Sequence, residues 1–530
     1  MYQALITRRY LTSKVMPLLA SLAVVLCTAM VLITWSVMGG FLNSLLSTGR
    51  TMIGDVTINW PNRGFAHYDD LVARLEADPM IAAAAPVIET AGTLTLPDDR
   101  VELVLVKGVD PESFARVTRY AETIWWKPLA EPMPKDGERE DIRLNPSFQF
   151  DDGVGNRRVD WNEVERQGLT LSRVDPETGA PEPALVMGLN VSELNRRKIW
   201  GGYVPTYPQR QLADGSVEDV PAFLPVNGEV ILSVAPFDSK GRVVDMVTRS
   251  IPVANEFNTG VWDVDSRTVL VRLDLLQQML GMDRARRVEQ GDPREAFAPY
   301  WDEAAQRWVF TPPDVVVEDP PRVTSVLVRA HDPDLDPEVL KAQCRIIYGG
   351  FVAAHAGEVP VASRIRVNSW ADLNRVMIAA VKKETSLVLF IFSFISLTAV
   401  FLVLAIFWSM VSERTREIGV LRALGASGLG VASLWLSYGL VIGFVGSALG
   451  LALAFVIVHN INPIHEWLGS ALGIVIWDPA IYVFTRIPSE VDPVHAAMVF
   501  VAGVVSCVVG ALIPAVRAAR MDPVAALRFE

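Results

Sequence analysis

TSLVLFIFSFISLTAVFLVLAIFWSMV, the stretch from Thr385 to Val411, contains no Asp, Glu, Lys or Arg. A helix of about 20 mostly apolar residues is long enough to cross the hydrocarbon core of a bilayer. Three other uncharged runs reach that length: Pro17–Gly39, Leu429–Val458 and Val494–Ile513. The four runs predict four transmembrane helices. We expect the first to be an uncleaved anchor, because it exceeds the apolar core of about 7–15 residues that signal peptides have.

Lys and Arg near the ends of these runs predict the orientation, because cytoplasmic loops carry an excess of them. They gather in segments 1–16, 412–428 and 514–530, whereas segment 459–493 holds Arg486 alone. We therefore expect both termini and segment 412–428 to be cytoplasmic. Segments 40–384 and 459–493 are then extracytoplasmic.

The long segment 40–384 has the pattern of a folded α+β domain. Alternating apolar residues predict strands at 54–60, 101–109, 229–234, 243–253, 268–273 and 324–329. Helical spacing predicts helices at 68–77, 190–198, 274–280 and 337–347. The expected fold is therefore an α-helical membrane protein with a large α+β extracytoplasmic domain inserted after the first transmembrane helix.

Three further features divide this domain. Trp125, Trp126 and several prolines indicate a loop-rich insertion over 119–183, and a second polar insertion covers 284–321. From Ser369 onward, apolar residues recur at helical spacing, which predicts one continuous stalk helix leading into the second span.

Charge and motifs exclude several classes of function. The formal net charge is −12, and the acidic residues lie mainly in the extracytoplasmic segment, which argues against nucleic-acid binding. No lysine follows a glycine, so the phosphate-binding P-loop is absent, and so are HExxH and GxSxG. We predict a non-catalytic subunit that binds no cofactor and no metal, because His459 and His465 fit a loop surface better than a metal pair.

SERTREIGVLRALGAS, from Ser412 to Ser427, predicts a short cytoplasmic helix. Ser412 is a capping residue for its start, and Gly425 is typical of a helix end. An apolar face is expected from Ile418, Leu421, Ala423 and Leu424. Two interpretations fit: a helix lying on the lipid surface, and a coupling helix that docks into a cytoplasmic partner.

Glycines repeat in the third apolar run at 439, 443, 446 and 450. Small residues at this spacing allow two helices to approach closely. Packing within the chain and packing against a second chain are both consistent with the pattern.

Two motifs, REIGVLRALGAS (Arg416–Ser427) and PAVRAARMDPVAALRFE (Pro514–Glu530), resemble the FtsX-like permease superfamily. Within it, SWADLNRVMIAAVKKE (Ser369–Glu384) and WDPAIYVFTRIPSEVDP (Trp477–Pro493) resemble the transmembrane subunits of lipoprotein-releasing systems, the LolC/LolE family. The resemblance implies a permease subunit of an ABC transporter in the cell inner membrane. Such a transporter extracts lipoproteins and hands them to a periplasmic carrier.

The resemblance also implies partners and sites. The partners are two copies of a cytoplasmic ATPase that bind ATP and Mg, a second permease subunit (the same or homologous), the periplasmic carrier, the lipoprotein substrates and membrane lipid. The ATPase-coupling residues would be Arg416, Glu417, Ile418, Leu421, Arg422, Ala423, Leu424 and Gly425. The substrate cavity would involve Trp35, Val37, Met38, Phe41, Ile378, Val381 and Leu389. A hairpin contacting the carrier would include Pro236, Phe237, Arg242 and Val244.

Two other functions remain open within the superfamily. A MacB-like mechanical exporter subunit would act on peptides or small molecules already in the periplasm. An FtsX-like regulator would activate a cell-wall hydrolase, and its exterior domain is expected to be much smaller than segment 40–384.

The orientation can be tested with single cysteines. Cysteines introduced at Ser239 and Ser489 should react with an impermeant thiol reagent in intact spheroplasts, and one at Ala518 should not. Labelling at position 518 in intact cells would contradict the four-span topology, because the basic tail would then lie outside.

Overall fold

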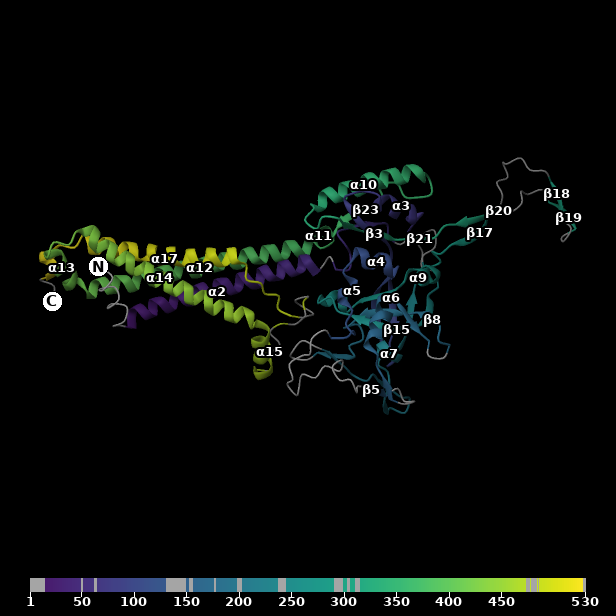
Figure 1. Cartoon of the computed structure of the whole chain (residues 1–530), viewed down its shortest axis with the longest axis horizontal. Coiled ribbons are helices and arrows are strands. Elements are labelled where there is room, and N and C mark those ends of the chain that lie inside the picture. The colour runs from purple at the N-terminus through teal and green to yellow at the C-terminus, as the bar shows by residue number, and fades with distance from the viewer. Residues whose placement is uncertain are drawn as a thin grey trace. The chain divides into compact units, whose positions relative to one another are not determined.

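The computed structural model describes residues 15–48, 51–61, 64–129, 149–151, 156–175, 178–197, 203–236, 245–289, 299–302, 306–309, 315–472, 477, 484 and 486–527. The chain divides into two compact units (Figure 1). The helical unit contains Met1–Leu45, Arg375–Asp478 and Arg486–Glu530. The sheet unit contains Leu46–Asn374 and Pro479–Thr485, so it ends ten residues before the boundary expected at Glu384.

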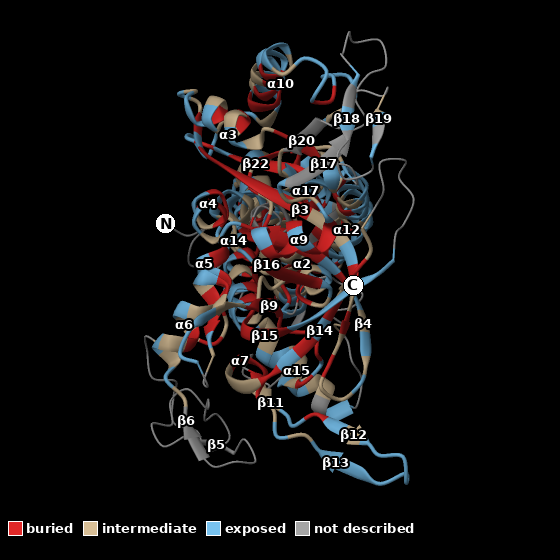
Figure 2. Ribbon diagram, turned by 90° about the vertical axis from the view of Figure 1, so that its right-hand side faces the viewer, coloured by how far each residue is buried: buried red, intermediate tan, exposed pale blue. Residues whose placement is uncertain are grey.

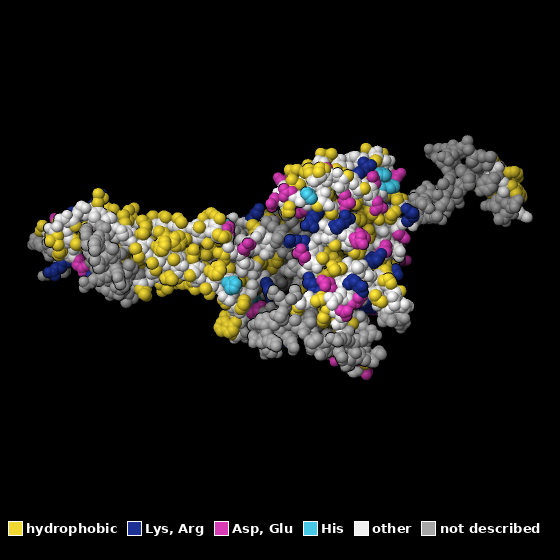
Figure 3. Space-filling view, viewed as in Figure 1, with side chains coloured by type: hydrophobic (Ala, Val, Ile, Leu, Met, Phe, Trp, Pro, Cys, Tyr) yellow, Lys and Arg dark blue, Asp and Glu magenta, His cyan; other side chains and the backbone are white. Residues whose placement is uncertain are grey.

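Four helices of the helical unit are long and apolar enough to cross a membrane: α2 (Val15–Thr48), α12 (Arg375–Glu413), α14 (Gly428–His459) and α17 (Pro493–Ala519). Hydrophobic side chains cover their visible faces (Figure 3). All four extend beyond the predicted apolar runs, because helical hydrogen bonding continues into the flanking polar residues. The unit also contains α13 (Thr415–Ala423), α15 (Ile461–Leu472) and α18 (Pro523–Leu527).

Helix α15 corrects the expectation that 459–493 is a loop throughout. Ile461, Ile464 and Leu468 recur at the i, i+3, i+7 spacing of an apolar helix face. The helical period is hard to recognise from the sequence, because segment 461–472 is short and lies between two long apolar runs.

The glycines of α14 pack within the chain. A Cβ on Gly439 would lie 2.8 Å from the Cβ of Ala511 in α17, and one on Gly443 would lie 2.9 Å from the Cβ of Cys507. Both distances are shorter than van der Waals contact, so α14 and α17 approach this closely only because these positions lack a side chain.

The other two glycines face the first helix. A Cβ on Gly446 would lie 3.0 Å from the Cβ of Val24 in α2, and one on Gly450 would lie 2.8 Å from the carbonyl oxygen of Val25. Each glycine pair therefore packs against one neighbouring helix of the same chain. The repeated glycines thus allow packing within the chain, the first of the two interpretations given above. We call these four contacts the glycine seam.

The sheet unit is built on nine hydrogen-bonded strands. Their order is β14 (Glu229–Val234), β15 (Val247–Phe257), β9 (Leu185–Gly188), β16 (Thr268–Arg272), β4 (Val101–Val109), β3 (Ile81–Thr95), β22 (Ser325–Ala330), β1 (Val56–Asn59) and β23 (Arg366–Ser369). β14 also pairs with β3, which closes the first six strands into a ring. The pairs β15–β9 and β16–β4 are parallel, and the others are antiparallel.

The long strand β3 closes the ring because it pairs with two different strands along its length. Residues Ile81–Val87 pair with β22, whereas Gly92–Thr95 pair with β14. At the crossing, a Cβ on Gly92 would lie 2.9 Å from the carbonyl oxygen of Ser233, so a larger residue would separate the strands. The open and the closed part of the sheet therefore share one strand.

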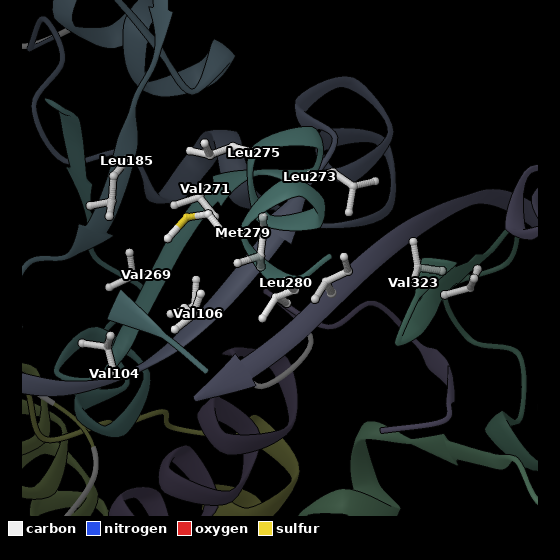
Figure 4. Packing of buried hydrophobic residues seen from close by; sticks show 14 of the residues in the cluster. Val104, Val106, Leu185, Val269, Val271, Leu273, Leu275, Met279, Leu280 and Val323 are labelled. Atoms are coloured by element: carbon white, nitrogen blue, oxygen red, sulfur yellow. The ribbon is translucent and has the colours of Figure 1, made fainter. Parts of the chain in front are cut away.

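The main core lies between this sheet and three helices, α3 (Tyr68–Glu76), α9 (Leu273–Leu280) and α10 (Pro337–Ala354). Met279 and Leu280 of α9 pack near valines of β4 and β16 (Figure 4). The strands beneath the helices are largely buried (Figure 2). Each large apolar side chain removed from water in this way contributes roughly 1.5–3 kcal/mol.

The remaining described elements are short. They are β2 (Phe65–Ala66), α4 (Pro111–Val117), α5 (Tyr120–Thr123), β5 (Gln149–Asp151), β6 (Asn156–Arg158), α6 (Trp161–Thr170), β7 (Ser172–Val174), β8 (Pro181–Pro183), β10 (Asn195–Arg197), β11 (Tyr203–Pro205), β12 (Gln209–Gln211), β13 (Val217–Asp219), α7 (Leu224–Asn227), α8 (Trp262–Asp265), β17 (Ala285–Glu289), β18 (Tyr300–Asp302), β19 (Arg307–Val309), β20 (Val315–Asp319), β21 (Arg322–Val323) and α11 (Trp370–Leu373).

Two predicted helices are wrong in part. Within the predicted helix 190–198, the described residues 190–197 form a turn and strand β10, because Glu193 has a positive φ of 53° and the Asn195 side chain donates to the carbonyl oxygen of Leu189. The stalk is interrupted at Asn374, whose φ of −105° and ψ of 18° are not helical and whose amide donates to the carbonyl oxygen of Trp370. Asn side chains compete for backbone groups in this way.

The two expected insertions are more ordered than predicted. Within 119–183, helices α5 and α6 are formed, and Trp126 is fully buried instead of marking a loop. Trp126 packs edge-on against Phe223. Its burial therefore depends on a segment about a hundred residues away, which local composition does not reveal. Within 284–321, β17 pairs with β20, and β18 pairs with β19.

Glu256 of β15 is a buried carboxyl group beside Trp126. It accepts hydrogen bonds from Trp126 Nε1 at 2.6 Å and Asn195 Nδ2 at 2.8 Å. Burial nevertheless raises its pKa from 4.5 to about 7. Because the folded chain then binds this proton more tightly than the unfolded chain, the contribution of Glu256 to stability falls as pH rises from about 4.5 through 7.

Glu256→Gln should lower the melting temperature, because its NH₂ group would face one of the two donors and leave it unsatisfied, at a cost of about 1–3 kcal/mol. The variant cannot titrate at this position. The difference in melting temperature between wild type and variant should therefore be larger at pH 5.5 than at pH 8. A difference that grows with pH would contradict this assignment.

Candidate functional site

A half-open cavity of about 260 Å³ lies between helices of the helical unit. Its walls come from α2, α12 and α17, and the lining residues are Val24, Cys27, Thr28, Val31, Trp35, Leu389, Phe392, Ser393, Ser396, Ala399, Val400, Val403, Met498, Val499, Ala502, Gly503, Ser506 and Cys507. None of these described lining residues is charged. An apolar cavity of about 150 Å³ already holds a benzene molecule, so this space accommodates a larger apolar group.

Two hydroxyl groups in the wall are hydrogen-bonded to the backbone of their own helix. Thr28 donates to the carbonyl oxygen of Val24 at 2.8 Å, and Ser393 donates to that of Phe390 at 2.6 Å. Both bonds stay within one helix, so the hydrogen is directed at the backbone rather than into the cavity. The wall therefore favours a hydrocarbon guest over a charged one.

The cavity ends where α12 meets α17. A Cβ on Gly510 would lie 3.0 Å from Cγ1 of Val403, so the two helices are in contact there. Toward the other end, the lining residues include Trp35 of α2 and Leu389 of α12. The space thus lies around the middle of the three helices.

A polar cluster adjoins Trp35. Its indole ring stacks on His495, with ring centroids 4.2 Å apart. His495 Nδ1 lies 3.1 Å from Asp492 Oδ2, and the same side chain of Asp492 accepts from the backbone N–H of Val494 at the start of α17. These contacts fix the indole ring that forms one end of the cavity wall.

The structure brings two of the seven expected cavity residues into this wall, Trp35 and Leu389. Val37 and Met38 are half-buried and do not line it. Phe41, Ile378 and Val381 are buried elsewhere, and Phe41 packs edge-on against Trp477. The space lies deeper along the helices than expected.

Sequence reasoning missed the residues of α17 and the deeper part of α2. A usable signal was present, because small residues recur among large apolar ones at Ser393, Ser396 and Ala399, and again at Ala502, Gly503 and Ser506. Small side chains on facing helices leave room where larger ones would fill it.

Helix α13 is the expected coupling helix, and its start differs from the prediction. α12 continues to Glu413, so Ser412 lies inside that helix and is not a cap. The residue before α13 is Arg414, which forms an ion pair with Glu417 and gives no side-chain cap. The end is as predicted, since Gly425 has a φ of 96° that favours glycine.

The predicted apolar face of α13 is divided between two directions. Ile418 is buried in one hydrophobic cluster with Val431 and Ala518, which attaches α13 to the rest of the helical unit. Leu421 is half-buried, whereas Leu424 is 81 % exposed.

The outward surface of α13 combines charge with apolar area. Arg416, Glu417 and Ala423 are exposed, and Arg422 is half-buried. Leu429, at the start of α14, is 84 % exposed close by in sequence. An apolar side chain surrounded by charged ones at a chain reversal is suited to a groove on another protein.

The expected carrier hairpin is described only in part. Pro236 follows strand β14 and is half-buried. Phe237, Arg242 and Val244 lie outside the described residues, so their role stays a prediction.

Comparison with known families matches residues 389–523 to the FtsX-like permease C-terminal family. The match begins at Leu389, which lines the cavity, and it includes α13, α14 and α17. Both candidate sites of the helical unit therefore lie largely within the family region.

Individual proteins are similar over parts of the chain. The lipoprotein-releasing system transmembrane protein LolC of Neisseria meningitidis is 28 % identical over 174 residues, 32 % of this chain and 42 % of that protein. LolC of Xylella fastidiosa is 24 % identical over 208 residues, 39 % of this chain and 47 % of that protein. The matches thus span less than half the length of these relatives.

A third relative and one solved structure carry another name. The macrolide export ATP-binding/permease protein MacB of Hyphomonas neptunium is 34 % identical over 120 residues, 23 % of this chain and 15 % of that protein. The periplasmic region of MacB from Actinobacillus actinomycetemcomitans has 8 % identity and a TM-score of 0.27, over 62 % of this chain and 95 % of that one. That score does not establish a common fold. The chain thus contains a region that matches the FtsX-like permease C-terminal family, and it is similar over part of its length to the LolC and LolE transmembrane proteins.

Proposed function

We propose that this chain is the transmembrane permease subunit of an ABC transporter that extracts lipoproteins from the inner membrane and passes them to a periplasmic carrier. Both termini and α13 face the cytoplasm, and the sheet unit faces the periplasm. ATP and Mg bind to a separate ATPase, present in two copies. A second permease subunit, the same or homologous, completes the complex.

The observation that carries this proposal is the uncharged, half-open cavity between α2, α12 and α17. Moving an acyl chain out of a bilayer costs about 0.8 kcal/mol per CH₂ group. A cavity whose described wall is apolar offsets much of that cost, because the chain leaves lipid without entering water. A multiply acylated anchor can therefore leave the bilayer in steps.

Extraction still needs work, and the sequence has no P-loop to supply it. The work must come from a partner that contacts the cytoplasmic side. α13 is suited to that contact, because Ile418 fixes it to the helical unit while Leu424 remains exposed. Movement of α13 would be transmitted to α14 and α17 through the cluster around Ile418.

A second candidate function is export of peptides or small molecules from the periplasm. The identity with MacB supports it, but only over 120 residues. A substrate already in the periplasm needs no hydrocarbon cavity within the membrane. The cavity therefore favours lipoprotein release.

Depletion of the protein should leave outer-membrane lipoproteins stranded in the inner membrane. A photocrosslinking residue at Ser396, in the cavity wall, should capture an acylated protein in the wild-type background. The same crosslinker at Phe390, which is 61 % exposed on α12, should capture lipid instead. Normal lipoprotein sorting after depletion, with no acylated protein crosslinked, would favour the MacB-like exporter.

Filling the cavity should block release. Val400→Trp adds a large uncharged side chain to the wall and should reduce lipoprotein release at least tenfold in the reconstituted complex. Phe401→Trp, at the next residue and on an exposed face, is the matched control and should keep near-normal release. Equal activity of the two variants would show that the cavity is not used.

The coupling role of α13 has its own test. Leu424→Asp should leave the melting temperature unchanged, because the side chain is exposed, yet uncouple ATP hydrolysis from release. Leu424→Met should retain release. Ile418→Asp should instead destabilise the helical unit by several kcal/mol, because it buries an unpaired carboxylate. Normal coupling in Leu424→Asp would favour a helix that only lies on the lipid surface.

A further inference from the structure

Four chemically versatile side chains meet on the sheet unit, away from the core. His67 immediately precedes α3, and Asp70 is in the first turn of that helix. His355 follows the last residue of α10, and Glu358 lies three residues further on. The cluster therefore joins the start of one helix to the end of another across most of the length of the domain sequence. Histidine side chains reach the surface of this unit (Figure 3).

The two imidazole rings are stacked almost in parallel, with centroids 4.4 Å apart and an interplanar angle of 10°. Each ring contacts one carboxylate. His67 Nε2 lies 2.5 Å from Glu358 Oε2, and His355 Nε2 lies 2.9 Å from Asp70 Oδ2. One nitrogen or oxygen atom from each of His67, His355 and Glu358 lies within 4.8 Å of the other two.

We propose that His67, His355 and Glu358 bind a divalent transition-metal ion, with Zn²⁺ the best fit. Zn–N bonds are about 2.0–2.1 Å and Zn–O bonds about 2.0–2.2 Å, so two ligands of a tetrahedral ion lie about 3.3–3.5 Å apart. The longest separation in the cluster, at most 4.8 Å, would have to shorten by little more than an ångström, and the 2.5 Å contact between His67 and Glu358 would have to open by about an ångström. Two histidines and one glutamate form a known zinc ligand set that leaves the fourth position to water.

Asp70 completes the arrangement from outside. A metal-binding histidine commonly donates its other ring nitrogen to a carboxylate, which fixes the ring and its tautomer. Asp70 is held by Arg74, whose Nε donates to the same oxygen at 2.8 Å. The carboxylate of Asp70 thus orients His355 through Nε2 and leaves Nδ1 of that ring to the metal.

The backbone of His67 has a left-handed conformation, with a φ of 57° and a ψ of 27°, and its side chain makes no helix-capping hydrogen bond. The imidazole ring stacks on that of His355 instead.

The surroundings allow a metal to enter. The side chains of His67 and His355 are 28 % and 23 % exposed, and that of Glu358 is 65 % exposed. Phe351 lies against His355 with ring centroids 5.0 Å apart, so the inner side of the cluster is apolar. A bound ion would tie the start of α3 to the end of α10. His67 lies almost 300 residues before His355 and Glu358 in the sequence. The site therefore cannot be recognised from the sequence as a short metal-binding motif can.

The test is metal binding by the full chain, purified in detergent through a tag without histidine and stripped with a chelator. Zn²⁺ titration should show one saturable equivalent per chain with micromolar or tighter affinity, and Zn²⁺ should raise the melting temperature. Co²⁺ should give the visible spectrum of a tetrahedral site. The His67→Ala/His355→Ala double variant should lose the equivalent and the thermal shift.

Two further variants keep the result interpretable. Glu358→Gln changes an exposed side chain, so it should fold normally while binding Zn²⁺ at least tenfold more weakly. His331→Ala, at an exposed histidine elsewhere on the same unit, is the matched control and should bind as wild type. If the wild-type chain binds no saturable equivalent of Zn²⁺, the proposal is wrong. The cluster would then consist only of two histidine–carboxylate pairs. Retention of that equivalent in the double variant would overturn the proposal as well.

Discussion

The close approach of α14 to α2 and α17 is the constraint on which the helical unit depends. In a membrane, helices gain little from hiding apolar surface from one another, so association relies on tight packing. Gly439 and Gly443 give that packing against α17, and Gly446 and Gly450 give it against α2. A single added methyl group at any of the four positions would meet an atom within about 3 Å.

This seam also explains where the cavity lies. α14 holds α2 and α17 close, and α17 contacts α12 at Gly510. The small residues Ser396, Ala399 and Ala502 do not fill the remaining space between α2, α12 and α17. The cluster around Ile418 lies where α13, α14 and α17 pack together, and the cavity lies between α2, α12 and α17. The proposed contact with the ATPase and the proposed substrate space therefore belong to the same helical unit.

Much of the architecture could be predicted from local patterns. The strands Val101–Val109 and Glu229–Val234 have the predicted bounds, because their alternation is regular, and the four long apolar helices follow from hydropathy alone. The ring closure through β14 and β3 could not be predicted, since it pairs segments more than a hundred residues apart. Trp126 was misread for the same reason, because Phe223 and Glu256 bury it from distant parts of the chain. At the candidate sites, Gly425 and Leu424 were recognisable, but the inward direction of Ile418 and the depth of the cavity depend on which helices are neighbours.

The most direct test of the central claim is an electron cryomicroscopy structure of the full transporter in lipid nanodiscs, without ATP, bound to a triacylated lipoprotein. We expect acyl-chain density between α2, α12 and α17, in contact with Val31, Ser396 and Ala502. Acyl chains bound only outside this space, with the cavity closed or filled by side chains in the complex, would contradict it.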